Sequence, residues 1–280
     1  MLLTFPIRST KLSMNVEVRS HLAHRTTPFQ VIDVYDTFAF GKVLFLDGHV
    51  QLSELDEHAY HESLVHIPLL NVGPSARRAL VVGGGDGGVL RELVKHPLEA
   101  IHMVEIDQGV IDVCREQMPE VSGGAFDDPR VEVFVEDAFP FVKQAEGEYD
   151  LIVMDSTDVY EEEEGGLSQQ LWTPDFYTDL SRLLAHGGFL VTQADNLLFC
   201  PYSLNGVLHT FSQVFPTTGS YWASVPSFGG YSGYAWASKG SRLASALPVT
   251  GLPLRYLDAT TYAMATQPLP FAVPRANEAE

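Results

Sequence analysis

Residues 79–88 read Ala-Leu-Val-Val-Gly-Gly-Gly-Asp-Gly-Gly, and this stretch decides the fold. Its first four residues form a short apolar run of the kind found in a buried strand of a parallel sheet. The glycines that follow let the backbone turn sharply and approach a ligand closely. An amphipathic segment over residues 89–95 then resembles a helix. The stretch therefore predicts a strand, a ligand-binding turn and a helix in immediate succession.

Strand-like and helix-like segments continue to alternate after this turn. Further strands are expected over residues 101–105, 131–135, 150–155 and 189–192, and further helices over residues 108–118 and 173–186. This alternation predicts an α/β fold with a doubly wound, mostly parallel sheet of the Rossmann type. Ligands of such sheets bind beyond the carboxyl ends of the strands, so the informative side chains should follow the strands directly.

The stretch before about residue 52 has a different character. Residues 29–35 and 42–46 resemble strands, and Asp47-Gly48 is typical of a hairpin because both residues tolerate positive φ. Ser53 is expected to cap a helix that Pro68 ends. We therefore expect two domains, a small N-terminal β domain over residues 1–53 and a Rossmann-like domain over residues 54–280.

The overall charge limits the partners that the protein can have. The formal net charge is -19, and an acidic surface repels phosphates, so we expect no nucleic-acid partner. Such a charge would attract a cationic substrate, although it can also serve solubility alone, which is the simpler interpretation of the charge by itself. Part of the acidity is local, because Glu161–Glu164 follows the expected strand 150–155 closely.

Composition and cysteine content favour a cytoplasmic protein. The chain is 45% hydrophobic and 19% charged. No apolar run is long enough to span a bilayer, and the N-terminus lacks the order of regions of a signal peptide, so we expect no membrane partner. Cys114 and Cys200 are too few for a disulfide framework and lack metal-type spacing, so we expect two small buried apolar residues.

Acidic side chains follow the first three strands of the expected sheet. Asp86 lies within the glycine turn, where a carboxylate would repel phosphate and suits a ligand that ends in an ammonium group; capping of the next helix is the alternative. Glu105 follows the second strand and can accept hydrogen bonds from ribose hydroxyls, whereas Asp107 is expected to cap a helix. Asp137 follows the third strand and could accept from the exocyclic amine of an adenine.

The fourth strand ends in two carboxylates, Asp155 and Asp158. Paired acids can bind a cation and accept a proton, and an exposed acidic loop is the alternative. Tyr60 and His61 are neighbours on the first expected helix and therefore point in different directions. A single histidine on a helix is more often structural than functional, so these two residues carry no function by themselves.

Taken in order, these motifs resemble the spermidine synthase family of polyamine aminopropyltransferases. The resemblance extends over roughly residues 28–240. The motifs that carry it are Leu46-Asp47-Gly48 with Gln51, Asp56-Glu57, Tyr60-His61-Glu62, the glycine turn with Leu90-Arg91-Glu92, Glu105-Ile106-Asp107, Asp128-Pro129-Arg130-Val131, Asp137-Ala138, Asp155-Ser156-Thr157-Asp158 and Pro226-Ser227.

The resemblance implies a methyltransferase-like Rossmann domain after the β domain, in a homodimer or homotetramer. It implies decarboxylated S-adenosylmethionine as a co-substrate that donates an aminopropyl group to a polyamine such as putrescine, with no prosthetic group and no metal. The residues that it assigns to the nucleoside are Gln30, Gln51, Gly83, Gly85, Asp86, Glu105, Asp137 and Ala138. Those that it assigns to the acceptor side are Tyr60, His61, Asp86, Asp155, Asp158, Gln193 and Tyr234, with Asp155 and Asp158 catalytic and Asp155 as the proton acceptor.

The segment after Asp158 departs from the family pattern. The family continues with a proline and a Gly-Pro segment, whereas this chain has Val159-Tyr160 and then Glu161–Glu164. We hypothesise that the acidic run selects an acceptor that is longer or more highly charged than putrescine, with a solvated lid as the alternative.

Two other functions stay open on the sequence alone. An S-adenosylmethionine-dependent methyltransferase can have the same fold, although Asp86 counts against it. A nucleoside-binding homologue without catalysis is favoured by the altered segment and disfavoured by the retained carboxylates.

Overall fold

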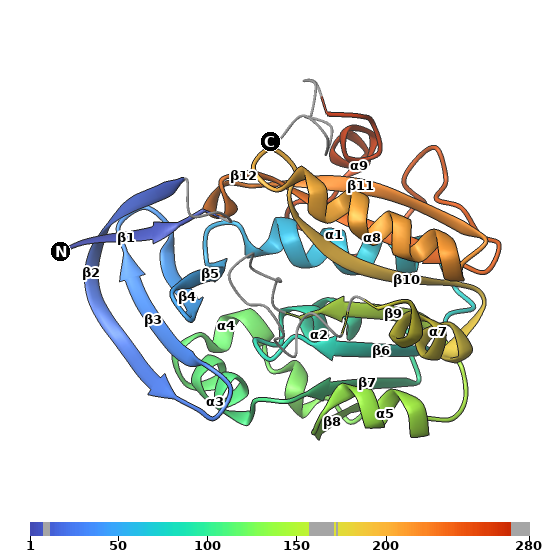
Figure 1. Cartoon of the computed structure of the whole chain (residues 1–280), viewed down its shortest axis with the longest axis horizontal. Helices are drawn as coiled ribbons and strands as arrows, with labels where there is room; N and C mark the ends of the chain where they lie inside the picture. Colours follow the sequence, from blue (N-terminus) through green and yellow to red (C-terminus); the bar gives the residue numbers. More distant parts are fainter. Residues whose placement is uncertain (8–11, 157–170, 172, 270–280) are drawn as a thin grey trace.

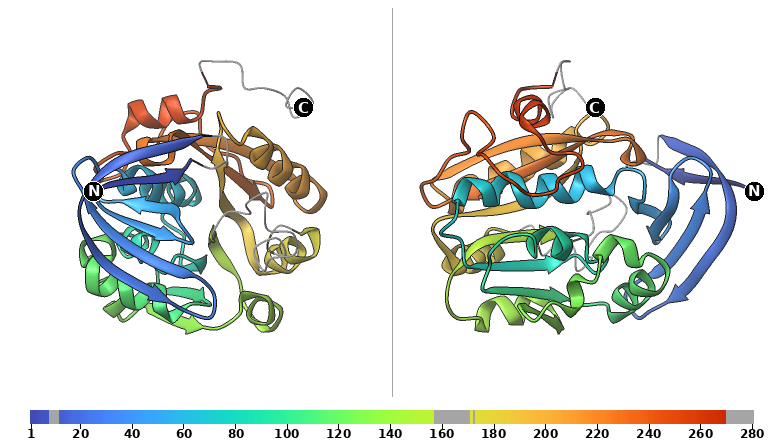
Figure 2. Two further views of the ribbon diagram at one scale, coloured as in Figure 1. Left: turned by 60° about the vertical axis from the view of Figure 1, so that its left-hand side comes forward. Right: turned by 180° about the vertical axis from the view of Figure 1, so that it is seen from behind.

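The computed structural model describes residues 1–7, 12–156, 171 and 173–269. Within them, a five-stranded sheet and a seven-stranded sheet lie beside one another, with helices around the larger sheet (Figure 1). Figure 2 shows the same two-part arrangement after a turn of 60° and from behind. No helix among the described residues is long and apolar enough to cross a bilayer.

The N-terminal sheet is an antiparallel meander that confirms the expected β character of this part. Its strands pair in chain order, each with the next. The turn between the last two strands has positive φ at Asp47 (48°) and Gly48 (80°), as expected for this dipeptide. The strands are β1 (Leu2–Pro6), β2 (Ser13–Thr26), β3 (Val31–Thr37), β4 (Gly41–Leu46) and β5 (His49–Ser53).

The larger sheet has the order β11-β12-β10-β9-β6-β7-β8. The five strands from β10 to β8 run parallel, and β12 pairs antiparallel with both β10 and β11. This confirms the doubly wound, mostly parallel fold, with an antiparallel hairpin at one edge. The strands are β6 (Arg78–Gly83), β7 (Ala100–Glu105), β8 (Val131–Val135), β9 (Tyr149–Asp155), β10 (Leu184–Asn196), β11 (Thr217–Val225) and β12 (Gly230–Ser238).

Helices cover both faces of the larger sheet. Alternate residues of β6 belong to two different cores: Ala79 and Val81 pack with α1 and α2, and Leu80 and Val82 pack with α5, α7 and α8. Burial of both faces explains why these strands are continuous apolar runs. The helices are α1 (Glu57–Val72), α2 (Gly88–Leu93), α3 (Gln108–Gln117), α4 (Pro119–Ser122), α5 (Ala138–Gln144), α7 (Pro174–Leu183), α8 (Pro201–Val214) and α9 (Ala259–Ala265).

Two predictions about the first helix are wrong. Pro68 lies inside α1, which continues to Val72 and ends at Gly73 with φ 86°. A proline costs the helix one hydrogen bond, but this helix is buried on most sides, and its packing outweighs the loss. Ser53 does not cap the helix; it ends β5, and its hydroxyl donates to Asp56 Oδ1 at 2.7 Å.

A third prediction is wrong at the other end of the large domain. The helix expected to reach residue 186 ends at Leu183, because β10 already begins at Leu184. Its start is as expected, with the Thr173 side chain accepting from Phe176 N and Pro174 at the first position. Both cysteines are buried and free, as expected for small apolar residues.

Candidate active site

A cavity of about 410 Å³ lies at the carboxyl ends of the central strands. Its walls come from the loops after β6, β7, β8 and β9, from β10, from the start of α1, and from the N-terminal sheet, which closes one side. The volume is within the range of pockets that enclose a small organic ligand. The site therefore needs both sheets to be complete.

The glycine turn lets two other elements approach the cavity. Gly83 has φ 85°, and a Cβ on it would lie 2.3 Å from the backbone oxygen of Asp155 on β9. A Cβ on Gly88 would lie 2.2 Å from the ring of His61 on α1. Only glycine permits these approaches, so the sequence of the turn brings β9 and α1 to the cavity.

A chain of charged side chains runs from α1 to the turn. Asp86 Oδ1 accepts a hydrogen bond from Gly88 N at 2.6 Å and lies 3.4 Å from His61 Nε2. The other ring nitrogen of His61, Nδ1, lies 2.7 Å from Glu57 Oε2. Arg91 donates to both oxygens of Glu57, at 2.9 and 2.7 Å. Asp86 thus accepts from the first N–H of α2 and has a histidine partner as well, although the N-cap residue of α2 is Gly87.

The carboxylates on either side keep His61 charged. Burial opposes the charge, but Asp86 and Glu57 raise the pKa of His61 to about 10. In return, His61 and the Gly88 N–H lower the pKa of Asp86 against the effect of burial. Asp86 is therefore ionised at neutral pH, although a buried carboxylate alone would tend to be neutral.

Asp155 ends β9 and lies close to Asp86 and His61, with one ligand atom of each within 4.8 Å of the others, but its own contacts differ. The Tyr60 hydroxyl donates to Asp155 Oδ1 at 2.6 Å. Asp155 Oδ2 is buried and has no hydrogen-bond partner among the described residues. Burial and the nearby Asp86 raise the pKa of Asp155 to about 6, against the lowering effects of His61 and Tyr60. This carboxyl can therefore gain and lose a proton near neutral pH.

Glu105, the last residue of β7, also lines the cavity. Glu105 Oε1 accepts from Asp107 N at 2.9 Å, and burial raises the pKa of Glu105 to about 7. Asp107 caps α3 as expected, because its side chain accepts from Gly109 N. Its other oxygen accepts from Gln30 Nε2 at 2.9 Å and from Thr27 Oγ1 at 2.7 Å. These bonds hold the N-terminal sheet against the ligand edge.

The remaining predicted residues occupy three parts of the wall. Asp137 caps α5 by accepting from Phe139 N at 2.9 Å. Gln193 Nε2 donates to Ser156 O at 3.4 Å, and Gln51 Nε2 donates to His49 O at 3.4 Å. The predicted residues that line the cavity are Gln30, Gln51, Tyr60, Gly83, Gly85, Asp86, Glu105, Asp137, Ala138, Asp155 and Gln193.

Three predicted residues are not part of this lining. His61 is only 1% exposed and lies behind Asp86. Tyr234 is completely buried, and its hydroxyl donates to the backbone oxygen of Tyr60 at 3.5 Å. Asp158 lies outside the described residues, as does the acidic run Glu161–Glu164.

Three aromatic residues that line the cavity were not predicted from the sequence. Phe29, Phe139 and Phe228 come from the N-terminal part, the start of α5 and the turn after β11. The one sequence signal for Phe29 is its position next to Gln30. In the structure Phe29 is half-exposed. Phe228 follows a motif of the family, but only the tertiary fold brings it beside the Tyr60 ring, at 5.7 Å between centroids.

The cavity is strongly acidic. Its described lining contains six carboxylic acids (Asp47, Asp86, Glu105, Glu136, Asp137 and Asp155) and no lysine, arginine or histidine. Such a wall repels phosphate and attracts a cation, because the low dielectric strengthens both effects. The fold and the cavity together define an α/β protein with a ligand site for a cationic small molecule.

Comparison with known proteins assigns the family. Residues 57–245 match the model of the spermine/spermidine synthase domain, and residues 5–54 match that of the spermidine synthase tetramerisation domain. The polyamine aminopropyltransferase of Moorella thermoacetica is 39% identical over 87% of this chain and 83% of its own length. That of Bacillus subtilis is 37% identical over 79% of this chain and 78% of its own.

Solved structures agree with the sequence relatives. The crystal structure of spermidine synthase from Thermotoga maritima superposes with a TM-score of 0.84 at 25% identity, covering 95% of this chain and 90% of that one. A spermidine synthase in complex with the transition state analogue AdoDATO gives 0.87 at 27% identity, covering 96% and 92%. The chain belongs to the spermine/spermidine synthase family, as the resemblance of its motifs implied.

Proposed function

We propose that the protein transfers the aminopropyl group of decarboxylated S-adenosylmethionine to a polyamine and releases 5'-methylthioadenosine. The observation that carries this proposal is the acidic cavity, in which an ionised Asp86 and a proton-accepting Asp155 face one space. Both the donor, a sulfonium with an ammonium tail, and the amine acceptor are cations. The names of the relatives support the same reaction.

The donor is proposed to lie along the carboxyl edge from β8 to β6. Glu105 would accept hydrogen bonds from the ribose hydroxyls, as an acid after the second strand does in related sheets. Asp137 and Ala138 would face the adenine, and Gln30 and Gln51 would complete the nucleoside side. The backbone of Gly83 and Gly85 would allow close approach.

Asp86 is proposed to hold the ammonium of the aminopropyl group. Its charge is secured by His61 before any ligand arrives, so binding need not ionise it. A charged hydrogen bond of this kind contributes about 1.5–3 kcal/mol. Intact S-adenosylmethionine carries the same ammonium but also a carboxylate, which the charge of Asp86 would repel, and this favours the decarboxylated donor.

The transfer itself needs no nucleophile from the protein. The acceptor nitrogen attacks the propyl carbon next to sulfur, the new N–C bond forms, and the electron pair of the C–S bond goes to sulfur. Freeing an alkylammonium of its proton at pH 7 costs about 4 kcal/mol. Asp155 is proposed to orient the amine and to accept the proton on Oδ2, which has no hydrogen-bond partner in the described part of the chain, with Asp158 as a second catalytic carboxylate.

An assay of donors against amines tests the proposal. The protein is incubated with decarboxylated or intact S-adenosylmethionine and with putrescine, cadaverine, agmatine, spermidine or norspermidine. Mass spectrometry should find methylthioadenosine and an aminopropylated amine. A methylated amine would instead indicate a methyltransferase, and nucleoside binding without any turnover would indicate a non-catalytic homologue.

The acceptor preference is a separate proposal that rests on the acidic run Glu161–Glu164. Neutralising these four residues with glutamine should move the preference toward putrescine, because fewer negative charges favour the smaller dication. An unchanged ranking of the five amines would remove the run from acceptor choice.

Assembly is proposed from the match to the tetramerisation domain, which favours a homotetramer over a homodimer. Light scattering coupled to gel filtration would decide between the two. A cytoplasmic location, expected from the composition, stays a prediction.

A further inference from the structure

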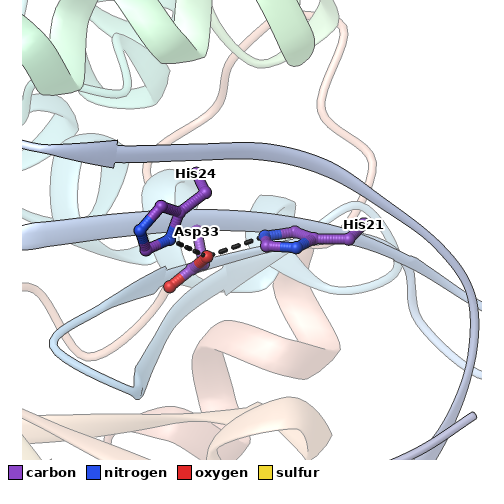
Figure 3. Close-up of side chains that lie close together, drawn as sticks. All are labelled: His21, His24 and Asp33. Carbon is purple, nitrogen blue, oxygen red and sulfur yellow. Dashed lines mark hydrogen bonds and ion pairs between the residues drawn. The ribbon is translucent and has the colours of Figure 1, made fainter.

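Two histidines and an aspartate meet on the N-terminal sheet, outside the cavity. His21 and His24 lie on β2, and Asp33 lies on the neighbouring β3 (Figure 3). His21 Nε2 and His24 Nδ1 lie 2.7 and 2.8 Å from the same oxygen, Asp33 Oδ1. The two rings approach this oxygen from different sides, so the three donor atoms converge on one point.

A bulge in β2 creates this arrangement. Residues three apart on a regular strand point to opposite faces, so His21 and His24 should lie on different sides of the sheet. The register shifts between His21, which pairs with Tyr35, and Ala23, which pairs with Val34. The extra residue, Leu22, returns both histidines to one face, the face of Asp33. The sequence spacing alone therefore hides the cluster.

The cluster is open to ions from solution. The side chains of His21 and His24 are 38% and 59% exposed, and that of Asp33 is 17% exposed. His21 is held in place by stacking on Tyr35, with 4.2 Å between the ring centroids. One ligand atom from each of the three residues lies within 4.8 Å of the others. The stacked ring of His21 and the mostly buried carboxylate of Asp33 form a partly preorganised set, to which the more exposed His24 adds the third ligand.

From this geometry we propose that His21, His24 and Asp33 bind a divalent transition-metal ion, with Zn²⁺ as the ion to test. Two imidazoles and one carboxylate suit Zn²⁺, Cu²⁺ and Ni²⁺, and do not suit Mg²⁺ or Ca²⁺, which prefer oxygen ligands. Zinc takes nitrogen at about 2.0–2.1 Å and oxygen at about 2.0–2.2 Å. Both N to O separations, 2.7 and 2.8 Å, must therefore widen by about 0.5 Å, which requires a rotation of the Asp33 carboxylate together with a change of the exposed His24 side chain.

The site would leave at least one position of a tetrahedral ion for water. The ion would clamp β2 to β3 at the bulge, where the regular ladder of hydrogen bonds is interrupted. The acidic protein as a whole raises the local concentration of cations, which assists binding. The ion takes no part in the proposed aminopropyl transfer.

Equilibrium binding of Zn²⁺ to the full chain tests the inference. Isothermal titration in a non-chelating buffer should give one equivalent of Zn²⁺ on the wild-type protomer. His24→Ala and Asp33→Asn should each weaken this binding by about 10- to 100-fold or more, the range seen even for residues that only support a ligand. Zinc should also raise the melting temperature of the wild type and of neither variant. X-ray anomalous scattering at the zinc edge would place the ion.

His209→Ala is the matched control, because His209 is an exposed histidine on α8 with no part in the cluster. It should bind Zn²⁺ as the wild type does, and circular dichroism should show all variants folded. Equal affinity in the wild type and His24→Ala would overturn the inference. That result would also follow if zinc bound instead at His61, Asp86 and Asp155, the acidic cluster of the cavity. Absence of any binding step in the wild type would overturn it as well.

Discussion

Asp86 and Asp155 line one cavity, yet their surroundings differ in charge. On the wall formed by α1 and the glycine turn, Asp86 lies against a protonated His61, which Glu57 and Arg91 hold in place. On the wall formed by β9, Asp155 has a neutral hydroxyl from Tyr60 and one oxygen without a partner among the described residues.

The difference separates two tasks that a carboxylate can perform. A carboxylate with a cationic partner stays ionised and binds a positive group without changing its own charge. A buried carboxylate without such a partner has a raised pKa and can take up a proton at neutral pH. The same residue type thus serves for binding on one wall and for proton transfer on the other.

Removal of the proton acceptor should have the largest effect. Asp155→Asn should lower kcat by about 100- to 10,000-fold, the usual contribution of a general base. Its Kd for methylthioadenosine should stay close to the wild-type value. Steady-state rates and calorimetry measure the two quantities.

Asp150→Asn is the control on the same strand, because Asp150 accepts from Arg77 N and Arg78 N at the opposite end of β9. It should lower stability and leave kcat unchanged. If Asp155→Asn kept more than a tenth of the wild-type kcat, the proton would have another acceptor.

Loss of charge on the other wall should affect binding of the donor. Asp86→Asn should raise the Kd of decarboxylated S-adenosylmethionine by about 10- to 100-fold, since a charged hydrogen bond is removed. Asparagine still offers an oxygen to Gly88 N, so this hydrogen bond is kept. Methylthioadenosine has no ammonium and serves as the internal control in the same titrations. An equal rise in Kd for both ligands would mean that Asp86 does not bind the ammonium and serves only to accept from Gly88 N.

The stability of the protein should respond to pH through Asp155. Its native pKa of about 6 lies above the unfolded value near 3.9, so the native state holds a proton that the unfolded state has released. The raised pKa therefore stabilises the native state at low pH, and this contribution to stability is lost as the pH rises through 6. The free energy of unfolding of the wild type should therefore fall between pH 4 and pH 8, and that of Asp155→Asn should not fall in this way. Relative to the wild type, the variant should be about 1–3 kcal/mol more stable at pH 8 than it is at pH 4.

Thermal unfolding at matched protein concentration checks this, because assembly makes the melting temperature depend on concentration. A difference between the wild type and Asp155→Asn that is the same at both pH values would mean that the native carboxyl titrates normally.

The smallest effect is expected for the hydroxyl beside Asp155. Below its pKa the carboxyl is protonated and cannot act as a base, so kcat/KM should fall as the pH drops through about 6. The Tyr60 hydroxyl lowers the pKa of Asp155. In Tyr60→Phe, the fall of kcat/KM at low pH should therefore occur at a higher pH, by about one unit or less. Tyr149→Phe, which loses a contact with His102 away from the cavity, should leave the profile unchanged. A shift of this fall to lower pH would contradict the assigned contact.

Much of the fold could be predicted because the signals are local. The apolar runs of β6, β7 and β9 alternate with helical segments, and capping by Asp107 and Thr173 follows from hydrogen bonds over two or three residues. The wrong boundaries, at Pro68 and at Leu184, arose where packing outweighs local preference.

The acidic residues that follow the strands were predictable as a group, since parallel strands end at one edge. The sequence by itself determined that Asp86, Glu105, Asp137 and Asp155 share a cavity. It could not determine their ionisation, because a pKa depends on burial and on partners that are distant in sequence.

Only the tertiary structure decided which carboxylate is paired. Helix α1 brings His61 against Asp86 and the Tyr60 hydroxyl against Asp155, and neither contact has a signal in sequence spacing. The same holds for His21, His24 and Asp33, which one bulge places on a common face. The spacing of residues along a chain indicates the periodicity of helices and strands. The ionisation of a carboxylate and the register of a strand depend instead on which elements lie next to one another in the fold.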